Sequence, residues 1–436
     1  MSENMTMTAT RSTSVAGKDI TVLGAGVVGT CTALELQRRG ARVTLIDRKE
    51  PGRETSYGNA GVLARSSLFP LNNPGLLGDL PKLLTNRSAA LRYDWRFVLG
   101  NLSWATRFIL NARPARFRET TQALDSLIQL SIAGHKALIS QTGQERLLSD
   151  KGWVFLYRSQ EQFGKAGLQR RTLQAFDVDT EILDAEGLRQ LEPALNAIFP
   201  RALWIKDTHS VSDPGALVKA YAQLFRSNDG IIEQAEIRSL SEDESGVTLE
   251  FGDGRSRRSA HVVVCLGPWS KSLMQSFGYD VQMGFERGYH AHFTGEPDGA
   301  NAPLTRPIYD TGGSYVLAPM SQGLRLSSGV ELKDCDARPT PVQLDMVEHA
   351  ARQAICLGQR IEKQPWLGSR PTFPDSRPAI GRAPDAKHVS VAFGHQHIGL
   401  ATGPGTAQIL ADLIEGKSPP IDVQPFRPER FIRRRR

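Results

Sequence analysis

Residues 19–48 read DITVLGAGVVGTCTALELQRRGARVTLIDR, and this stretch decides the fold. Its first apolar run, Ile20 to Leu23, is typical of a buried parallel strand. Val27 to Arg39 fits a helix that ends before Gly40, and residues 41–47 fit a second strand. The order strand, helix, strand predicts a βαβ unit at the start of an α/β domain.

Three glycines lie between the first strand and the helix. Gly24, Gly26 and Gly29 have GxGxxG spacing, which permits a tight turn, close approach of a pyrophosphate and close packing of helix on strand. The helix N-terminus offers free N–H groups to that pyrophosphate. Asp47 lies 21 residues after Gly26, where an acid binds a ribose hydroxyl. The motif predicts a dinucleotide site and by itself leaves NAD and FAD open.

Charge and composition restrict the class of protein. The chain has 436 residues and a formal net charge of +7, and its last ten residues, 427–436, hold six arginines and one glutamate. The high isoelectric point therefore comes largely from a tail, which argues against a nucleic-acid-binding surface. We expect this basic tail to be a solvated extension, the alternative being an electrostatic tether to acidic lipid. A hydrophobic content of 40% excludes a wholly disordered chain.

The cysteines, the N-terminal segment and the lengths of the apolar runs restrict the class of protein further. The four cysteines are far apart and form no CxxC pair, so neither a disulfide framework nor a metal site is predicted. Residues 1–17 lack the apolar segment of a signal peptide and are predicted to be a disordered leader. No run of 18 apolar residues exists, so we expect a cytoplasmic protein, at most peripheral to the inner face of the cell membrane.

Further elements follow the βαβ unit. The loop Glu54 to Gly61 either turns toward the pyrophosphate or is a plain surface loop. Trp95, Trp104 and Phe108 are expected to pack in the core or at a domain interface, the alternative being an amphipathic patch that faces a membrane. Strands are predicted at residues 153–157, 231–237, 314–319 and 324–329, a hairpin at 247–251 and 260–265, and helices at 214–226, 340–357 and 408–414. In flavin enzymes of this build, a strand such as 261–267 returns to the dinucleotide domain.

The chain resembles the FAD-dependent amino-acid oxidoreductases, and within them the bacterial D-amino-acid dehydrogenases of the small-subunit type. The resemblance rests on VLGAGVVGT, ETSYGNAG, VVVCLGPWS, GLRLSSGVEL, WLGSRPTFPDSRPAIG and FGHQHIGLATGPGTAQILADLIEG, which span nearly the whole chain. It implies a Rossmann-like FAD-binding domain of the glutathione-reductase type and a second α+β substrate domain on a mixed or antiparallel sheet. The expected FAD domain is residues 18–90, 207–280 and 366–426, and the substrate domain is residues 91–206 and 281–365.

The resemblance also implies roles for particular residues. Arg370 matches the arginine that pairs with a substrate carboxylate, Tyr315 the tyrosine that assists it, and His397 a residue at the substrate entrance. The alternatives are a structural ion pair for Arg370, strand packing for Tyr315 and a structural role for His395 and His397. The residues implied to hold FAD are Gly24, Gly26, Val27, Val28, Gly29, Asp47, Arg48, Thr55, Ser56, Asn59, Ala60, Gly61, Gly267, Trp269, Gly394, His395, Ile398, Gly399 and Leu400.

The implied reaction is oxidative deamination of D-amino acids. Hydride passes from Cα to flavin N5, and the imino acid hydrolyses to a 2-oxo acid and ammonia. An arginine is a bidentate, permanently charged clamp for the substrate carboxylate. The segment Glu286–His290 differs from the lysine-containing stretch of D-alanine-active relatives, so D-proline and cis-4-hydroxy-D-proline become candidates. No cysteine or histidine stands where relatives attach flavin, so FAD is predicted to be non-covalent.

Other functions compete with this interpretation. Within the family, the alternative is a glycine or sarcosine-type oxidase, or an oxidase of another secondary amine. Outside it are an NAD-dependent dehydrogenase and a non-catalytic protein that uses its arginine tail on acidic lipid or nucleic acid. The electron acceptor, whether quinone, oxygen or another carrier, is left open, and contact with an acidic membrane is at most weak.

Overall fold

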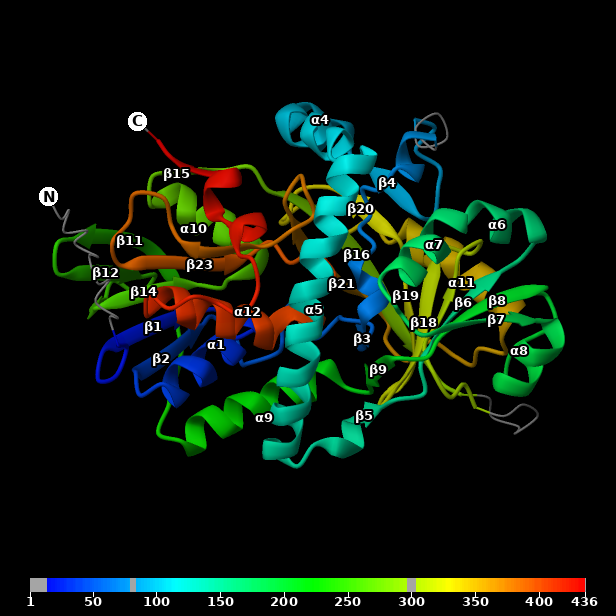
Figure 1. The fold of residues 1–436 in the computed structure, drawn as a ribbon, viewed down its shortest axis with the longest axis horizontal. Coiled ribbons are helices and arrows are strands. Elements are labelled where there is room, and N and C mark those ends of the chain that lie inside the picture. The colour runs from blue at the N-terminus through cyan, green and yellow to red at the C-terminus, as the bar shows by residue number, and fades with distance from the viewer. Residues whose placement is uncertain (1–13, 79–83, 296–302, 436) are drawn as a thin grey trace, which may run out of the picture.

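The computed structural model describes residues 14–78, 84–295 and 303–435. Most of the predicted leader, residues 1–13, lies outside the described residues. The end of that leader is ordered, because Val15 is fully buried in the first hydrophobic core. The described part of the chain has two large sheets, and the long helix α5 (Pro114–Thr142) runs between them (Figure 1). No helix in the described part of the chain is long and apolar enough to span a bilayer.

A six-stranded sheet forms the half that contains the N-terminal motif. Its neighbouring strands are parallel except for the last pair, and β1, α1 and β2 confirm the predicted βαβ unit. Burial of each large apolar side chain in its core stabilises the fold by about 1.5–3 kcal/mol. In spatial order the strands are β10 (Ile231–Gln234), β2 (Arg42–Asp47), β1 (Asp19–Leu23), β14 (His261–Val264), β23 (Val389–Phe393) and β22 (Ala379–Arg382). The helices that share its core with α5 are α1 (Val27–Arg38), α9 (Pro214–Ser227) and α12 (Gly399–Ile414).

The predicted hairpin has a different second strand. β12 (Gly246–Phe251) pairs with β13 (Ser256–Ser259) and with β11 (Ile237–Asp243), in a separate three-stranded sheet. The prediction of residues 260–265 as the second strand of the hairpin is therefore wrong. The actual second strand, β13, was missed because it is a polar, exposed strand. The fully buried β14 instead runs parallel to β1 and returns to the dinucleotide domain, as expected of a flavin enzyme.

The second half is built on a ten-stranded mixed sheet, which confirms the predicted α+β architecture. Most neighbours are antiparallel, whereas β17 runs parallel to β6 and β4 to β20. Its strands are β4 (Leu91–Tyr93), β20 (Val330–Leu332), β16 (Gly284–Phe293), β19 (Gly323–Ser327), β18 (Tyr315–Met320), β17 (Ile308–Asp310), β6 (Trp153–Tyr157), β8 (Arg201–Ile205) and β7 (Thr180–Asp184), with β21 (Trp366–Thr372) paired to β16. The helices of this half are α6 (Gln160–Lys165), α7 (Gly167–Ala175), α8 (Ala185–Leu191) and α11 (Val342–Ala354).

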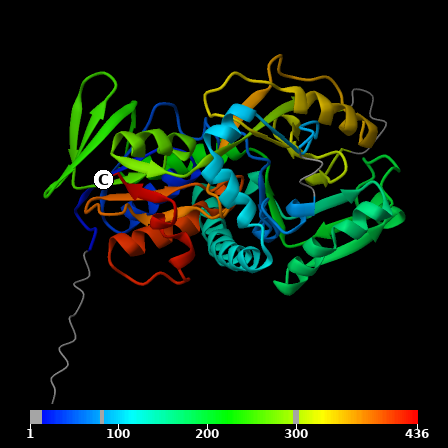
Figure 2. The same cartoon turned by 90° about the horizontal axis from the view of Figure 1, so that it is seen from above.

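Strand β21 connects the two halves. Its residues fall in the segment predicted as FAD domain, but they pair along β16 of the substrate sheet. A small sheet of β3 (Val62–Ala64), β9 (Thr208–Val211) and β5 (Leu148–Ser149) makes a second connection. Seen from above, the two halves lie on either side of α5 (Figure 2).

Helix α12 begins nine residues before the predicted start at residue 408. Its first turns contain Gly403, Pro404 and Gly405, which by propensity argue against a helix. Tertiary packing overrides propensity here, because a Cβ at Gly405 would lie 2.5 Å from Ser131 Oγ of α5. Ser131 Oγ also accepts the Gly405 N–H at 2.9 Å. The glycines are therefore needed for the close approach of α12 to α5.

The basic tail is not the expected solvated extension. β24 (Ile432–Arg434) pairs with β15 (Tyr279–Val281), next to α10 (Ser270–Ser276), and Ile432 is fully buried. Apolar residues at 431 and 432 anchor the segment, whereas Arg433 to Arg435 stay exposed.

Two short helices precede α5. α3 (Trp95–Gly100) and α4 (Leu102–Leu110) form a protrusion at one end of α5 (Figure 1). Trp104 and Phe108 are buried and stacked with ring centroids 5.0 Å apart, as expected of core aromatics. The expectation is wrong for Trp95, which is 53% exposed.

Candidate active site

One cavity of about 960 Å³ extends between the two sheets. At one end it is lined by the turn between β1 and α1, and at the other by strands β16, β21 and β6 of the substrate sheet. The predicted residues that line it are Gly24, Gly26, Val27, Val28, Asp47, Arg48, Thr55, Ser56, Asn59, Ala60, Gly267, Trp269, Arg370, His395, His397, Ile398, Gly399 and Leu400. Gly29, Gly61, Gly394 and Tyr315 do not line it.

The glycines of the β1–α1 turn make a cradle for a dinucleotide. Gly24 has a φ of +103°, and a Cβ there would lie 2.4 Å from the Cys265 carbonyl oxygen of the β14 end. A Cβ at Gly29 would lie 1.8 Å from the Gly24 carbonyl oxygen, so Gly29 supports the turn without facing the cavity. A Cβ at Gly26 would meet only the Ser56 hydroxyl, at 3.3 Å, which leaves space for a pyrophosphate. The three positions fit the roles predicted from their spacing.

Asp47, the acid expected to bind a ribose hydroxyl, is held in place by backbone N–H groups. Asp47 Oδ2 accepts the Ala25 N–H at 2.6 Å and Oδ1 accepts the Lys49 N–H at 3.0 Å. Burial raises the pKa of Asp47, and these two N–H groups oppose that rise. Beside it the Arg48 guanidinium lies 3.9 Å from the centre of a Trp269 ring, and both side chains line the cavity.

The loop after β2 folds toward the cradle and is not a plain surface loop. Ser56 Oγ accepts the Val27 N–H at 3.0 Å, at the start of α1. Thr55 Oγ1 donates to the Ser369 carbonyl at 3.2 Å, and Asn59 Nδ2 donates to the His397 carbonyl at 3.1 Å. These contacts tie the loop to both β21 and the segment before α12. Gly61, with a φ of +75°, ends the loop against the Val211 carbonyl.

The segment before α12 forms another wall. His395 Nε2 lies 3.1 Å from Thr406 Oγ1, and burial lowers the pKa of His395 to about 3. His397 also lines the cavity, and it is an exposed residue. Gly394 turns away, since a Cβ there would lie 2.3 Å from the Phe373 ring. Helix α12 starts at Gly399 and so presents its N-terminal N–H groups to the cavity.

Arg370 is a charged group at the end of the cavity lined by β16, β21 and β6, the end expected to hold the substrate. It stands on β21 directly opposite Glu286 of β16, and both side chains line the cavity. Among the described residues, the Arg370 guanidinium has no hydrogen-bond or ion-pair partner, and burial lowers its pKa although Glu286 opposes this. Its position depends on a glycine, because a Cβ at Gly288 would lie 2.5 Å from Arg370 Nη2. A partly buried guanidinium without a protein partner favours an anion beside it.

Two residues of β16 were missed as site residues. Burial raises the pKa of Glu286, opposed chiefly by Arg370, and its Oε1 has no hydrogen-bond partner among the described residues. His290 stacks on Trp366 with centroids 4.8 Å apart, and neither ring nitrogen has a partner in the described structure. The signal was present, because positions 286, 288 and 290 alternate and must share one face of a strand.

Tyr315 was predicted to touch the substrate, and the structure places it on the other face of the sheet. It packs in the core that includes Leu344 and Val347 of α11, whereas its neighbour Val316 lines the cavity. Side chains alternate along a strand, so one residue of register separates the two faces. The interpretation as a packed strand tyrosine is therefore the correct one.

Comparison with known proteins agrees with this site. The family model described as FAD dependent oxidoreductase matches residues 19–413. A D-amino-acid oxidase of Bradyrhizobium diazoefficiens is 30% identical over 423 residues, which cover 95% of this chain and 99% of the relative. A D-amino acid dehydrogenase of Dechloromonas aromatica is 28% identical, covering 92% of this chain and 97% of its own.

Solved structures of the same fold include a glycine oxidase from Geobacillus kaustophilus. It superposes with a TM-score of 0.73 at 21% identity and covers 95% of this chain and 98% of its own. This likeness confirms the predicted fold. The match over residues 19–413 includes the cradle, the loop at 54–61 and Arg370. The chain therefore belongs to the FAD-dependent oxidoreductase family, and its cofactor is FAD.

Proposed function

We propose that this oxidoreductase oxidises D-amino acids or cyclic D-imino acids. The observation that carries the proposal is Arg370, a partly buried guanidinium without a protein partner among the described residues, at the end of the cavity away from the glycine cradle. Such a group favours a substrate with a carboxylate. The names of the two bacterial relatives, a D-amino-acid oxidase and a D-amino acid dehydrogenase, support an amino-acid substrate of the D series.

Glu286 and Arg370 suit the two ends of an amino-acid zwitterion. Directly opposite residues on antiparallel strands have Cβ atoms about 4.5–5.5 Å apart. Arg370 binds the substrate carboxylate in this proposal, and Glu286 Oε1 accepts a proton from the substrate ammonium. The resulting neutral amine can release Cα hydride as its lone pair forms the C=N bond. Bound FAD supplies the two-electron oxidation by accepting that hydride, and water then hydrolyses an acyclic imine to a 2-oxo acid and ammonia.

The other residues that line this end of the cavity set the polarity around Glu286 and Arg370. Burial lowers the pKa of His290 to about 2, so this ring is neutral at physiological pH and adds no positive charge beside Arg370. Trp366 and Phe155 also line the cavity. An aromatic wall favours a compact apolar side chain or a ring, which keeps D-proline and cis-4-hydroxy-D-proline in the substrate class. A glycine or sarcosine-type oxidase is the alternative.

FAD binding is proposed to be non-covalent. The cysteine that lines the cavity, Cys265, is buried at the glycine cradle, and burial raises its thiol pKa to about 12. Such a thiol stays protonated and is a poor nucleophile. We also propose that the electron acceptor is a quinone or oxygen and that the protein lies peripherally at the cell membrane.

Anaerobic bleaching of the flavin tests the substrate class. The purified holoenzyme is mixed with D- and L-forms of alanine, proline and other amino acids, with cis-4-hydroxy-D-proline, glycine and sarcosine. We expect loss of oxidised-flavin absorbance with D-substrates and none with their L-enantiomers. Repeating the reaction with oxygen or a quinone analogue identifies the acceptor.

Two results would contradict parts of this proposal. Bleaching by glycine or sarcosine but by no chiral D-amino acid would favour the alternative oxidase. Acid precipitation with flavin remaining on the protein would reject non-covalent binding.

A further inference from the structure

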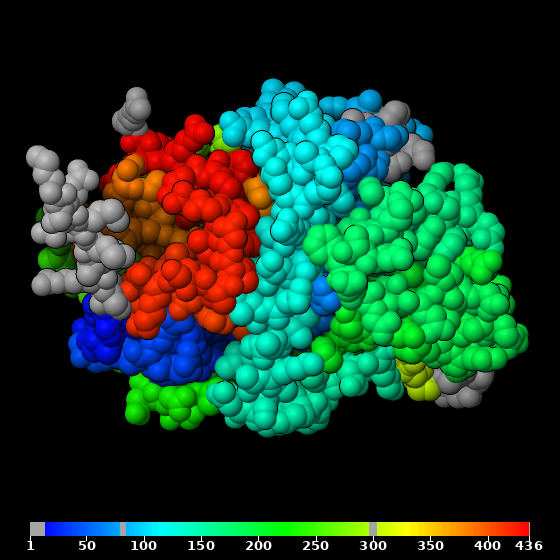
Figure 3. Space-filling view, viewed as in Figure 1, coloured from blue at the N-terminus to red at the C-terminus, as the bar shows by residue number. Residues whose placement is uncertain are grey.

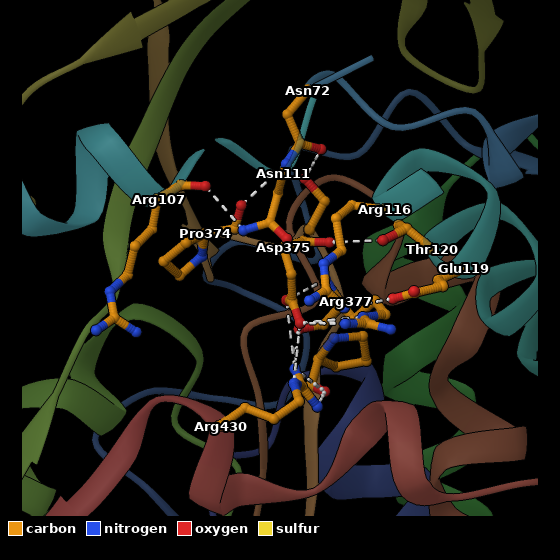
Figure 4. Close-up of polar contacts among 12 residues, drawn as sticks. Asn72, Arg107, Asn111, Arg116, Glu119, Thr120, Pro374, Asp375, Arg377 and Arg430 are labelled. Atoms are coloured by element: carbon orange, nitrogen blue, oxygen red, sulfur yellow. Dashed lines mark hydrogen bonds and ion pairs between the residues drawn. The ribbon is translucent and has the colours of Figure 1, made fainter. Parts of the chain in front are cut away.

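A second cavity, of about 510 Å³, lies away from the active site. It is enclosed by the end of α4, the start of α5, the loop at 374–378 and the C-terminal segment at 430–431. Arg107, Arg113, Arg116, Arg377 and Arg430 all line it, against the single carboxylate of Asp375. Figure 4 shows the side chains of Arg377 and Arg430 meeting at Asp375, with Arg107 and Arg116 on neighbouring segments.

Asp375 is shared by two of the arginines. Its Oδ2 accepts from Arg377 Nη2 at 2.8 Å and from Arg430 Nε at 2.9 Å. The side chains of Arg377 and Arg430 are only 11% and 16% exposed. One carboxylate therefore balances two nearly buried guanidinium groups, and one positive charge remains in excess. Burial lowers the pKa of Arg430, as does repulsion from Arg377, while Asp375 acts in the opposite direction.

The rim adds further positive charge. Arg116 is balanced by Glu119, at 2.9 Å, but the guanidinium groups of Arg107 and Arg113 have no ion-pair or hydrogen-bond partner among the described residues. Arg113 is also the N-cap of the 29-residue α5, whose first turn has no side-chain cap and no acidic residue. The free N–H groups of this turn add a partial positive charge.

Exposed apolar side chains lie next to the cavity. On α4 and at the end of α3, Leu99, Leu102, Ile109 and Leu110 are 62%, 55%, 37% and 41% exposed. Leu110 belongs to both features, since it also lines the arginine cavity. An apolar helix face beside clustered arginines is the pattern of a surface that meets anionic lipid. The space-filling view shows α4 and the start of α5 at the molecular surface (Figure 3).

We propose that this arginine cavity binds a phosphate group, with Arg107 and Arg113, unpaired among the described residues, at its rim and the Asp375-paired Arg377 and Arg430 at its base. The phosphate comes either from a soluble phosphate compound or from the headgroup of an acidic phospholipid. The exposed leucines of α3 and α4 favour the headgroup. The site is separate from the proposed amino-acid chemistry, and none of these arginines lines the main cavity.

Two binding measurements on the holoenzyme distinguish the sources. Calorimetric titration with pyrophosphate measures the soluble arm, and flotation with phosphatidylglycerol or phosphatidylcholine vesicles measures the lipid arm. The test variant is Arg107→Gln/Arg113→Gln, and the matched control is Arg226→Gln, at an exposed arginine of α9. Removing two positive charges from the rim should weaken pyrophosphate binding at least about 10-fold, and flavin absorbance should stay at the wild-type value.

The lipid source has its own signature. Flotation with phosphatidylglycerol but not phosphatidylcholine, lost in Arg107→Gln/Arg113→Gln and in Leu102→Ser/Ile109→Ser, assigns the site to a headgroup. Pyrophosphate binding without flotation assigns it to a soluble phosphate. If wild type binds neither probe, or if Arg226→Gln weakens binding as much as the double variant, the proposal is overturned. Arg107→Lys/Arg113→Lys, which keeps both charges, should retain most of the binding.

Discussion

The two ends of the main cavity differ in how their polar groups are satisfied. At the cradle, both Asp47 oxygens, Ser56 Oγ and Asn59 Oδ1 already accept backbone N–H groups. At the substrate end, Arg370, Glu286 Oε1 and both nitrogens of His290 have no partner among the described residues. The cofactor end is therefore shaped by the backbone, whereas the substrate end keeps charges that the substrate must satisfy.

The largest expected effect comes from breaking the cradle. Gly29→Ala places a Cβ 1.8 Å from the Gly24 carbonyl oxygen, so the turn must shift. We expect loss of bound FAD and of all activity, with the free energy of unfolding lower by about 3 kcal/mol. Flavin absorbance per protein and chemical denaturation measure the two effects.

Gly164→Ala is the matched control for the cradle. It also adds a methyl group within a helix, where a Cβ meets nothing within 4 Å. Full flavin content in Gly29→Ala would show that the cradle is not rigid.

The next largest effect is expected when the positive charge of Arg370 is removed from the substrate end. Arg370→Ala should lower kcat/KM by about 10²- to 10³-fold, mostly through KM, because one charge-assisted clamp is worth several kcal/mol. Flavin content should stay unchanged, since Arg370 belongs to the other end of the cavity. Steady-state kinetics with the best D-substrate measure this, with Arg226→Ala as control. Wild-type kinetics in Arg370→Ala would remove the carboxylate clamp from the proposal.

A smaller effect is expected from the opposite strand. Glu286→Gln removes the proton acceptor but keeps the volume, and kcat/KM should fall by about 100-fold. Burial raises the pKa of Glu286, and the carboxylate is the active form. Wild-type kcat/KM should therefore fall as the pH drops through this raised pKa, and the variant should lack that acidic limb.

The pH profile separates proton transfer from simple packing. A purely structural Glu286 would lower stability or kcat/KM in the variant without changing the shape of the profile. An unchanged acidic limb in Glu286→Gln would assign that limb to another group.

The sequence predicted the cofactor half better than the substrate half. The β1–α1–β2 unit and its glycines depend on local spacing, so a single stretch specified them. The substrate end depends on pairing between distant strands, such as β16 with β21, and a one-residue change of register moves a side chain to the opposite face. That is why Arg370 could be matched by its motif, while Tyr315 was assigned to the wrong face.

The same distinction explains the misplaced ends of elements. Helix α12 starts at Gly399 because Gly403 and Gly405 pack on α1 and α5, a tertiary reason that local propensity opposes. The position of the tail could not be predicted either. Its net charge predicts that it is solvated, whereas Ile432 pairs in a strand with Val281, 151 positions earlier.

The smallest effect is expected at Tyr315, which lies on the face of the sheet away from the substrate end. Tyr315→Phe removes a buried hydroxyl that has no hydrogen-bond partner among the described residues, on the α11 side of the sheet. Because no bond is lost, unfolding free energy should change by less than about 1 kcal/mol and kcat/KM by less than about twofold. Val316→Ala, at the adjacent cavity-lining position, is the comparison and should raise KM for substrates with bulky side chains. Loss of activity in Tyr315→Phe but not in Val316→Ala would mean that Tyr315 reaches the substrate carboxylate, as the resemblance implies.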